Sequence, residues 1–213
     1  LSTLQYLNLE KNSLVGPIPT TFGQLSSLTY MQLSGQNLND ATSDLAFPDE
    51  LGSLSNLEQL WLDSCGLSGK LPPSLPAGLT SAKILRLNTN KAISGEIWPD
   101  VDKFANSLEQ MYLFDNALSG KIPDSICGLK NIQKMSIRTN QFTGQFPSCW
   151  GSLSKLWFFW GFSNQLTGPF PSMNGTIVTQ FRMEDNQLSG ELPASLKDWA
   201  VLTDLSIQNN QFS

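Results

Sequence analysis

One pattern of apolar residues, asparagine, glycine and proline recurs along the 213 residues of this chain, and it limits the folds open to the chain more than any other feature. Its first copy consists of Leu1, Leu4, Leu7, Leu9, Asn12, Leu14, Gly16, Ile18 and Pro19. A later copy consists of Leu129, Ile132, Met135, Ile137, Asn140, Phe142, Gly144, Phe146 and Pro147. Every exchange between these two copies replaces one apolar residue by another. The chain is therefore expected to fold as a stack of similar units, because no unit can bury its own apolar face.

The copies follow one another over residues 1–213 with spacings of 22 to 29 residues. They begin at Leu1, Leu25, Leu54, Leu79, Ala105, Leu129, Leu153, Gly175 and Trp199. This register gives eight whole repeats and part of a ninth, which we interpret as a single domain. Exposed ends of a repeat stack normally carry a polar cap, and neither end of the pattern has one. We therefore expect the chain to be a fragment of a longer protein.

Each repeat contains one short strand. Apolar and polar residues alternate in the run from Tyr6 to Glu10, so the leucines enter the core while their neighbours face water. One such strand per repeat predicts a parallel β-sheet. After the strand, a glycine, an apolar residue and a proline permit a tight turn, and the chain then returns along the outer face.

An asparagine follows the strand in most repeats, where the chain turns away from the sheet. A side-chain amide at this point can satisfy backbone groups that would otherwise be buried without partners. We expect these residues to form an internal, largely buried ladder rather than a ligand site: Asn12, Asn90, Asn116, Asn140, Asn164, Asn186 and Asn210.

Several runs of the sequence resemble a known family. The segments NSLVGPIPTTFGQLSSL, NALSGKIPDSICGLKNI and NQLSGELPASLKDW are similar to the plant-type leucine-rich repeat of receptor-kinase ectodomains, receptor-like proteins and polygalacturonase inhibitors. The resemblance covers essentially the whole chain. It implies an α/β repeat fold: a right-handed solenoid with a parallel concave sheet, a second short strand per repeat, and 3-10 or irregular segments on the convex side.

Three departures from the pattern stand out. An insertion covers Asn39 to Ala46, Trp98 lies between the expected Ile97 and Pro99, and Cys65 replaces a ladder asparagine. We expect Cys65 to remain a free thiol.

The other two cysteines suggest an extracellular protein. Stacking of adjacent repeats would bring Cys127 and Cys149 within reach of a disulfide, and similar pairs occur in the receptor-like proteins that the chain resembles. The alternative is a pair of small buried thiols. The sequon at Asn174 matches an N-glycosylation acceptor. Together these features favour an extracellular or cell-surface location.

The overall charge argues against nucleic acid as a partner. The chain has 13 Lys and Arg against 18 Asp and Glu, so no basic excess is present to follow a phosphate backbone. The longest strongly apolar run, from Leu156 to Phe162, is far shorter than the roughly 20 residues that cross a bilayer. We expect no membrane insertion by this segment.

Catalysis is not predicted. The chain contains no histidine, which removes Ser-His and Cys-His couples and histidine metal sites, and it has no phosphate-binding glycine loop. Carboxylates such as Asp63, Asp115, Glu184 and Asp185 are interpreted as a solvated rim of the sheet rather than as acid and base catalysts. No cofactor is expected.

The concave face is the predicted binding surface for a peptide, protein or oligosaccharide. Strands stacked in register place large side chains in neighbouring exposed columns, at positions that the core does not require. Aromatic residues and arginine are enriched at binding hot spots. The predicted ligand-binding residues are Trp61, Arg86, Tyr112, Phe114, Arg138, Phe158, Trp160, Phe162 and Arg182.

Two alternatives remain open at this stage. Gly161 stands where a core leucine is expected, so a local bulge could turn Trp160 or Phe162 inward to fill the missing volume. The chain could also be a structural subunit of a larger extracellular assembly, in which the aromatic residues are buried against a fixed partner.

Overall fold

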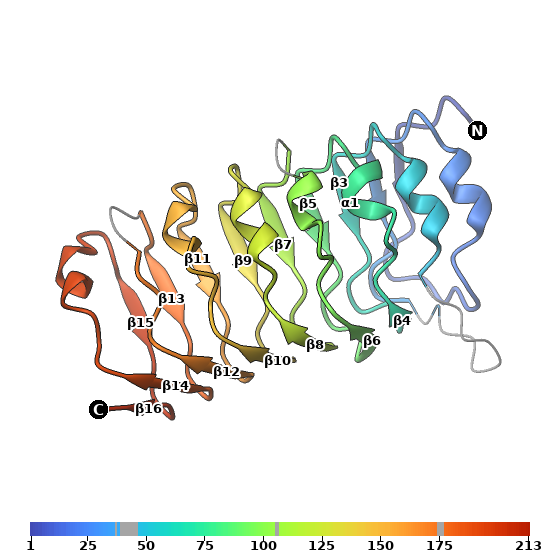
Figure 1. The fold of residues 1–213 in the computed structure, drawn as a ribbon. Coiled ribbons are helices and arrows are strands. Elements are labelled where there is room, and N and C mark those ends of the chain that lie inside the picture. The colour runs from blue at the N-terminus through green and yellow to red at the C-terminus, as the bar shows by residue number, and fades with distance from the viewer. Residues whose placement is uncertain (37, 39–46, 105–106, 174–176) are drawn as a thin grey trace.

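The computed structural model describes residues 1–36, 38, 47–104, 107–173 and 177–213 and is an elongated solenoid. The repeats lie side by side in chain order, with the N-terminus at one end and the C-terminus at the other (Figure 1). The insertion from Asn39 to Ala46 and the sequon at Asn174 lie outside the described residues.

The larger sheet contains nine strands and is parallel throughout. The strands are β1 (Tyr6–Asn8), β2 (Tyr30–Gln32), β3 (Gln59–Trp61), β5 (Ile84–Arg86), β7 (Gln110–Tyr112), β9 (Lys134–Ser136), β11 (Phe158–Trp160), β13 (Gln180–Arg182) and β15 (Asp204–Ser206). Equivalent positions of successive repeats pair directly: Leu7 with Met31, and Met31 with Leu60. The middle residue of each inner strand is buried, as the alternation predicted.

A second parallel sheet of seven strands runs along the next side of the solenoid. Its strands are β4 (Ser68–Lys70), β6 (Ala92–Gly95), β8 (Ala117–Lys121), β10 (Gln141–Gly144), β12 (Gln165–Gly168), β14 (Gln187–Gly190) and β16 (Gln211–Phe212). These are the short second strands that the family resemblance implied. Glycines in this sheet, such as Gly95 and Gly144, have positive φ, which favours glycine at the tight turn.

Short helical turns form the outer face. They are η1 (Thr20–Gln24), η2 (Asp49–Ser53), α1 (Leu75–Gly78), η3 (Val101–Phe104), η4 (Asp124–Gly128), η5 (Trp150–Ser152) and η6 (Ala194–Asp198). All but α1 are 3-10 helices, so the predicted solenoid class is confirmed. Trp98 is buried on this side, and its indole N–H donates to the Pro72 carbonyl at 2.7 Å. The indole N–H of Trp98 is therefore hydrogen-bonded although it is buried, because the side chain reaches the preceding repeat.

The asparagine ladder joins each repeat to the one before it. Asn164 Nδ2 donates to the carbonyls of Ile137 in the preceding repeat and Gly161 in its own, both at 3.1 Å. Its Oδ1 accepts the backbone N–H of Phe142 at 3.0 Å. Asn90, Asn116, Asn140, Asn186 and Asn210 donate in the same way to their own and the preceding repeat.

Burial of the ladder is less uniform than the sequence suggested. Asn90, Asn164 and Asn186 are buried, whereas Asn116, Asn140 and Asn210 are half-buried. The expectation was wrong for Asn12, which is exposed. Asn12 lies in the first repeat of the given sequence, and its side chain donates to the carbonyls of Leu9 and Glu10 in its own turn.

Two other side chains replace asparagine in the ladder. The Cys65 thiol donates to the Leu33 carbonyl at 3.1 Å, and burial raises its pKa to about 12, so it remains protonated and able to donate. Gln36, which the sequence analysis missed, donates to the Leu9 carbonyl and accepts the Leu14 N–H. The residue type varies here while the hydrogen-bonding function is kept.

Cys127 and Cys149 form a disulfide on the outer side, with their Cα atoms 6.0 Å apart. Cys127 lies in η4 and Cys149 immediately precedes η5, so the bond connects two adjacent repeats. Cys65 is the buried free cysteine that the sequence predicted.

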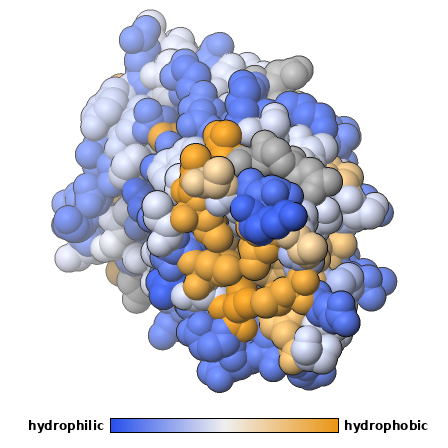
Figure 2. Space-filling view, turned by 90° about the vertical axis from the view of Figure 1, so that its left-hand side faces the viewer, coloured by the Kyte–Doolittle hydropathy of each residue, from blue (hydrophilic) through white to orange (hydrophobic). Residues whose placement is uncertain are grey.

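The C-terminal end of the solenoid is apolar. Figure 2 shows this end face, where hydrophobic side chains gather at the surface of the last repeat. Leu192 and Val201 are exposed there, and Leu205, Ile207 and Phe212 are only partly buried. The corresponding residues of inner repeats are covered by the next repeat, which shows how strongly burial depends on stacking.

Replacing Asn140 with Ala should lower the free energy of unfolding by about 1 to 3 kcal/mol, because backbone groups of two repeats lose their partner. Chemical denaturation followed by circular dichroism measures the change. Asn12→Ala is the matched control and should change stability by less than about 0.5 kcal/mol, since the Asn12 side chain is exposed. Equal effects of the two substitutions would contradict the inter-repeat function of the ladder.

Reduction of the Cys127–Cys149 disulfide should lower stability by roughly 3 kcal/mol, because the bond closes a 22-residue separation in the unfolded chain. Denaturation with and without dithiothreitol tests this. In a variant with both cysteines replaced by Ala, the reductant should have no further effect. A reductant-sensitive double variant would show that the stabilisation comes from elsewhere.

Candidate ligand-binding surface

The register of the nine-stranded sheet brings the predicted concave residues into neighbouring columns. Trp61 pairs with Arg86, and Arg86 pairs with Tyr112. Further along the sheet, Trp160 pairs with Arg182. Phe114, Arg138 and Phe162 lie two residues beyond this column, in the neighbouring one.

These side chains belong to a continuous row that we call the concave ribbon. It consists, in spatial order, of Tyr6, Tyr30, Trp61, Arg86, Tyr112, Phe114, Arg138, Phe162, Trp160 and Phe158. Each member contacts the next through ring packing or through a guanidinium placed over a ring. The ribbon crosses seven strands, from β1 to β11, which corresponds to about 29 Å of sheet.

The first part of the ribbon was not predicted from the sequence. Tyr6 and Tyr30 stack with ring centroids 4.4 Å apart and nearly parallel planes, and Tyr30 continues to Trp61 at 5.9 Å. Both tyrosines occupy the first position of their strands, which also holds Phe158 in β11. That shared position was the signal available in the sequence.

Two arginines in the middle of the ribbon are clamped between rings. The Arg86 guanidinium lies 4.6 Å from the Trp61 ring centroid and 5.3 Å from that of Tyr112. The Arg138 guanidinium lies 4.0 Å from Phe114 and 5.4 Å from Phe162. Such contacts stabilise a partly desolvated cation by roughly 0.5 to 2 kcal/mol each.

Arg182, at the far end, is held differently. Its Nε lies 3.5 Å from a Glu184 carboxylate oxygen and 3.8 Å from one of Asp204, while its guanidinium is also near the rings of Trp160 and Phe162. Its charge is therefore offset within the protein. Arg86 and Arg138 form no ion pair within 4.0 Å in the part of the chain that the structure describes.

Burial modifies the titrating groups of the ribbon. Burial is the main cause that raises the pKa of Tyr112. Burial is also the main cause that raises the pKa of Tyr30, and the nearby Tyr6 is the second cause. Desolvation lowers the pKa of Arg138, partly opposed by the Asp115 carboxylate. The phenols stay neutral at physiological pH, so both hydroxyls are donors: Tyr30 bonds to Gln32 and Tyr112 to Gln110.

Several buried polar atoms on this face lack hydrogen-bond partners among the described residues. The N–H donors are Nε1 of Trp61 and Trp160 and Nε of Arg86, Arg138 and Arg182; Asn88 Oδ1, Ser136 Oγ and Glu184 Oε2 are also unpaired. Buried polar atoms in native proteins are usually hydrogen-bonded, so this group calls for a partner. Most of the unpaired atoms are donors, which suits a ligand rich in acceptor oxygens.

Gly161 does not produce the bulge considered from the sequence. The Gly161 N–H donates to the Arg182 carbonyl at 2.8 Å, and β11 pairs with β9 and with β13 in the regular register on both sides of Trp160. The missing volume is filled from the core, because a Cβ on Gly161 would lie 2.7 Å from Met183 Sδ and 2.9 Å from the Phe159 ring. Trp160 and Phe162 consequently stay on the concave face.

All nine predicted ligand-binding residues lie on this face, but they are half-buried rather than fully exposed. The cause is their packing against one another along the ribbon. Cross-strand contacts of this kind also stabilise the sheet, so the same side chains contribute to both folding and the surface.

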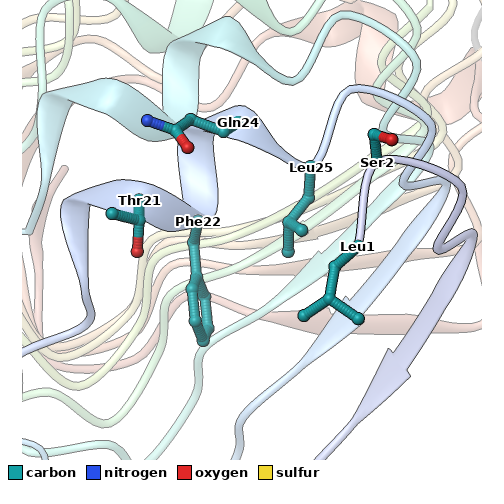
Figure 3. Close-up of a pocket in the computed structure, with 6 residues that line it drawn as sticks. All are labelled: Leu1, Ser2, Thr21, Phe22, Gln24 and Leu25. Atoms are coloured by element: carbon teal, nitrogen blue, oxygen red, sulfur yellow. The ribbon is translucent and has the colours of Figure 1, made fainter.

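The pocket at the N-terminal end of the described chain differs from the concave ribbon. Figure 3 shows a pocket at the N-terminal end, lined by Leu1, Ser2, Thr21, Phe22, Gln24 and Leu25. Leu1, Phe22 and Leu25 direct apolar side chains toward the open end of the core, and no charged side chain lines the pocket. Among the described residues, no group of three or more Cys, Asp or Glu could hold a metal ion, and no helix has the length and apolar content to cross a membrane.

Comparison with known proteins identifies the repeats. The family model described as Leucine Rich Repeat matches residues 3–25, 56–77 and 107–129. Receptor-like protein 52 of Arabidopsis thaliana is 36% identical over 89 residues, which cover 42% of this chain and 11% of that protein. The chain spans 8% to 16% of the length of the curated relatives that it matches.

Solved structures share the same architecture. The ectodomain of the Arabidopsis receptor kinase HAESA, in complex with an N-terminally extended IDA peptide hormone, aligns with a TM-score of 0.80 and 28% identity over 95% of this chain and 37% of that one. A plant ice-binding protein aligns with a TM-score of 0.84 and 25% identity over 96% of this chain and 64% of that one. The scaffold is therefore compatible with very different ligands, and function has to be argued from the surface.

Replacing Gly161 with Ala should lower the free energy of unfolding by about 1 to 3 kcal/mol, because the new methyl group would overlap Met183 and Phe159 in the core. Urea denaturation measures the effect. Gly161→Ala should cost less stability in a Phe159→Leu background than in the wild type, because the smaller side chain leaves room for part of the new methyl group. A stabilised Gly161→Ala variant would mean that an unfilled space exists at this position.

Proposed function

We propose that this chain, which belongs to the plant-type leucine-rich-repeat proteins, is a recognition domain that binds an extended peptide along the concave ribbon. The observation that carries this proposal is the unbroken row of aromatic and arginine side chains across seven strands. The core requires none of these side chains, and aromatic and arginine residues are the types that dominate binding hot spots.

The arrangement of the rings favours a peptide over an oligosaccharide. Flat sugar faces stack best on an open, coplanar platform. Only Tyr6 and Tyr30 have nearly parallel planes, whereas Tyr112 and Phe114 meet edge to face and Trp160 is tilted against its neighbours. Tilted rings leave notches that suit separate side chains. The indole N–H groups of Trp61 and Trp160 are buried without an acceptor among the described residues, and a tilt of either ring would let its N–H donate to a carbonyl oxygen of an extended backbone.

The similar proteins support the same assignment. The HAESA ectodomain is described with a peptide hormone ligand, and Receptor-like protein 52 belongs by name to the receptor-like proteins. An ectodomain is the part of a receptor outside the cell, so the proposed location is extracellular or at the cell surface. A disulfide such as Cys127–Cys149 is stable in that oxidising environment.

The proposed role requires no chemistry from the chain. Two of the carboxylates on this face are engaged in other contacts: Asp63 accepts a hydrogen bond from Ser34 at 2.8 Å, and Glu184 lies beside Arg182. With no histidine in the sequence, no side chain titrates near neutral pH without a large perturbation. Binding without catalysis is the function that we assign.

Trp160→Ala should weaken peptide binding by more than about 1 kcal/mol, because Trp160 contacts both Phe158 and Phe162 and carries an unpaired indole N–H. The probe is the best binder from a phage library of random 12-residue peptides selected on the wild-type domain, and fluorescence anisotropy measures Kd.

Trp150→Ala provides the matched control, since Trp150 is buried in the core. It should lower stability by about 3 to 5 kcal/mol. Trp160→Ala should lower stability by only about 1 kcal/mol, because Trp160 is half-buried and loses only its contacts along the ribbon. The proposal fails when no library peptide binds, or when Trp160→Ala binds the selected peptide with unchanged Kd.

A further inference from the structure

We propose that Arg86 and Arg138 are paired anion subsites, so that the concave ribbon selects extended peptides with two acidic side chains four residues apart. This inference rests on the proposed peptide-binding function and adds the chemical class of the ligand. It starts from a difference between the two ribbon arginines and Arg182 beside them: all three contact aromatic rings, but their ionic partners differ.

The first step concerns charge. Arg182 has two carboxylates within 4.0 Å, those of Glu184 and Asp204. Arg86 and Arg138 have none at that distance among the described residues, although each lies on a partly buried face. A cation that has lost part of its hydration gains most from an added anion, because the interaction strengthens as local water is displaced.

The second step concerns the other donors. Nε of Arg86 and Nε of Arg138 are buried without acceptors, and so is the indole Nε1 of Trp61, whose ring packs on Arg86. A guanidinium fixed between two rings has little rotational freedom left to lose on binding. It presents N–H groups in the planar geometry that a carboxylate accepts in bidentate fashion.

The third step concerns nearby acidic groups. Asp63 is bonded to Ser34 and forms no ion pair with Arg86. Asp115 is near enough to raise the pKa of Arg138 but does not approach within ion-pair distance. On the other side, Lys134 lies over the Trp157 ring and adds a further positive charge close to β9. The carboxylates of the residues that the structure describes therefore leave both clamps free to accept an outside anion.

The spacing follows from the register. Arg86 of β5 pairs with Tyr112 of β7, and Tyr112 pairs with Ser136 of β9. Arg138 lies two residues after Ser136 in the sequence. The separation is two strand spacings of about 4.8 Å across the sheet and two residues of about 3.3 Å along it, which gives about 12 Å. An extended peptide advances about 3.3 Å per residue and its side chains alternate between opposite faces, so two acidic residues four positions apart face the ribbon together and lie about 13 Å apart, close to this distance.

The test uses fluorescein-labelled ten-residue peptides of alanine and serine with one tyrosine. They carry two glutamates separated by one, three, four or seven positions, and a matched peptide has glutamine in place of both. Anisotropy titration with the wild-type domain should give a Kd at least ten-fold lower for the four-position peptide than for all the others, including the three-position peptide, whose two glutamates point to opposite faces of an extended backbone. Arg86→Gln and Arg138→Gln should each remove most of that preference. Lys70→Gln on the second sheet removes one positive charge far from the ribbon and should leave the preference unchanged.

The outcomes separate this inference from the proposed function. Equal binding of the glutamine and glutamate peptides, still dependent on Trp160, would overturn the anion pair and leave peptide recognition intact. Equal binding at every glutamate spacing would overturn the paired geometry. An oligosaccharide of uronic acids that binds through Arg86 and Arg138, when no peptide does, would overturn both. The peptide series uses the wild-type protein, so a poorly folded arginine variant would not prevent a decision.

Discussion

Hydrogen bonds between successive repeats are the constraint on which the rest of this structure depends. After each inner strand the chain turns through a residue with positive φ, such as Thr89, Thr139 or Ser163, and leaves backbone carbonyls that the sheet does not pair. The following ladder side chain bonds to carbonyls of its own repeat and of the preceding one. Where asparagine is absent, Gln36 or the protonated Cys65 thiol performs the same function. The requirement is for a short donor at this position rather than for one residue type.

A ladder that fixes each repeat against the previous one also fixes the columns of the sheet. Residues at equivalent strand positions are placed about 4.8 Å apart, whatever their chemistry. Inward positions have to be apolar, while outward positions are free of that requirement. Aromatic and arginine side chains at outward positions thus become neighbours in space although they lie in different repeats. The concave ribbon is a consequence of register, and its composition is where a particular function can be encoded.

The side chains of the ribbon are held firmly by one another, yet several of their buried N–H donors have no acceptor among the described residues. Ring–guanidinium contacts immobilise Arg86 and Arg138 and bury their Nε atoms, while Trp61 and Trp160 keep indole donors without acceptors. A surface arranged in this way loses little conformational freedom on binding, which improves affinity. Arg182 shows the opposite arrangement, since Glu184 and Asp204 already balance its charge.

The sequence by itself determined the solenoid, the strand of each repeat, the identity of most ladder residues and the column that contains Trp61, Arg86 and Tyr112, because a repeating pattern of apolar residues allows only one register. It could not decide how Gly161 is accommodated, since Phe159 and Met183 fill that space from a different strand position and a different repeat. Nor could it show that Tyr6 and Tyr30 extend the ribbon, or that Arg182 is paired while Arg86 and Arg138 are not. These features depend on side-chain packing and on distances of a few ångströms between repeats, which only the tertiary structure specifies.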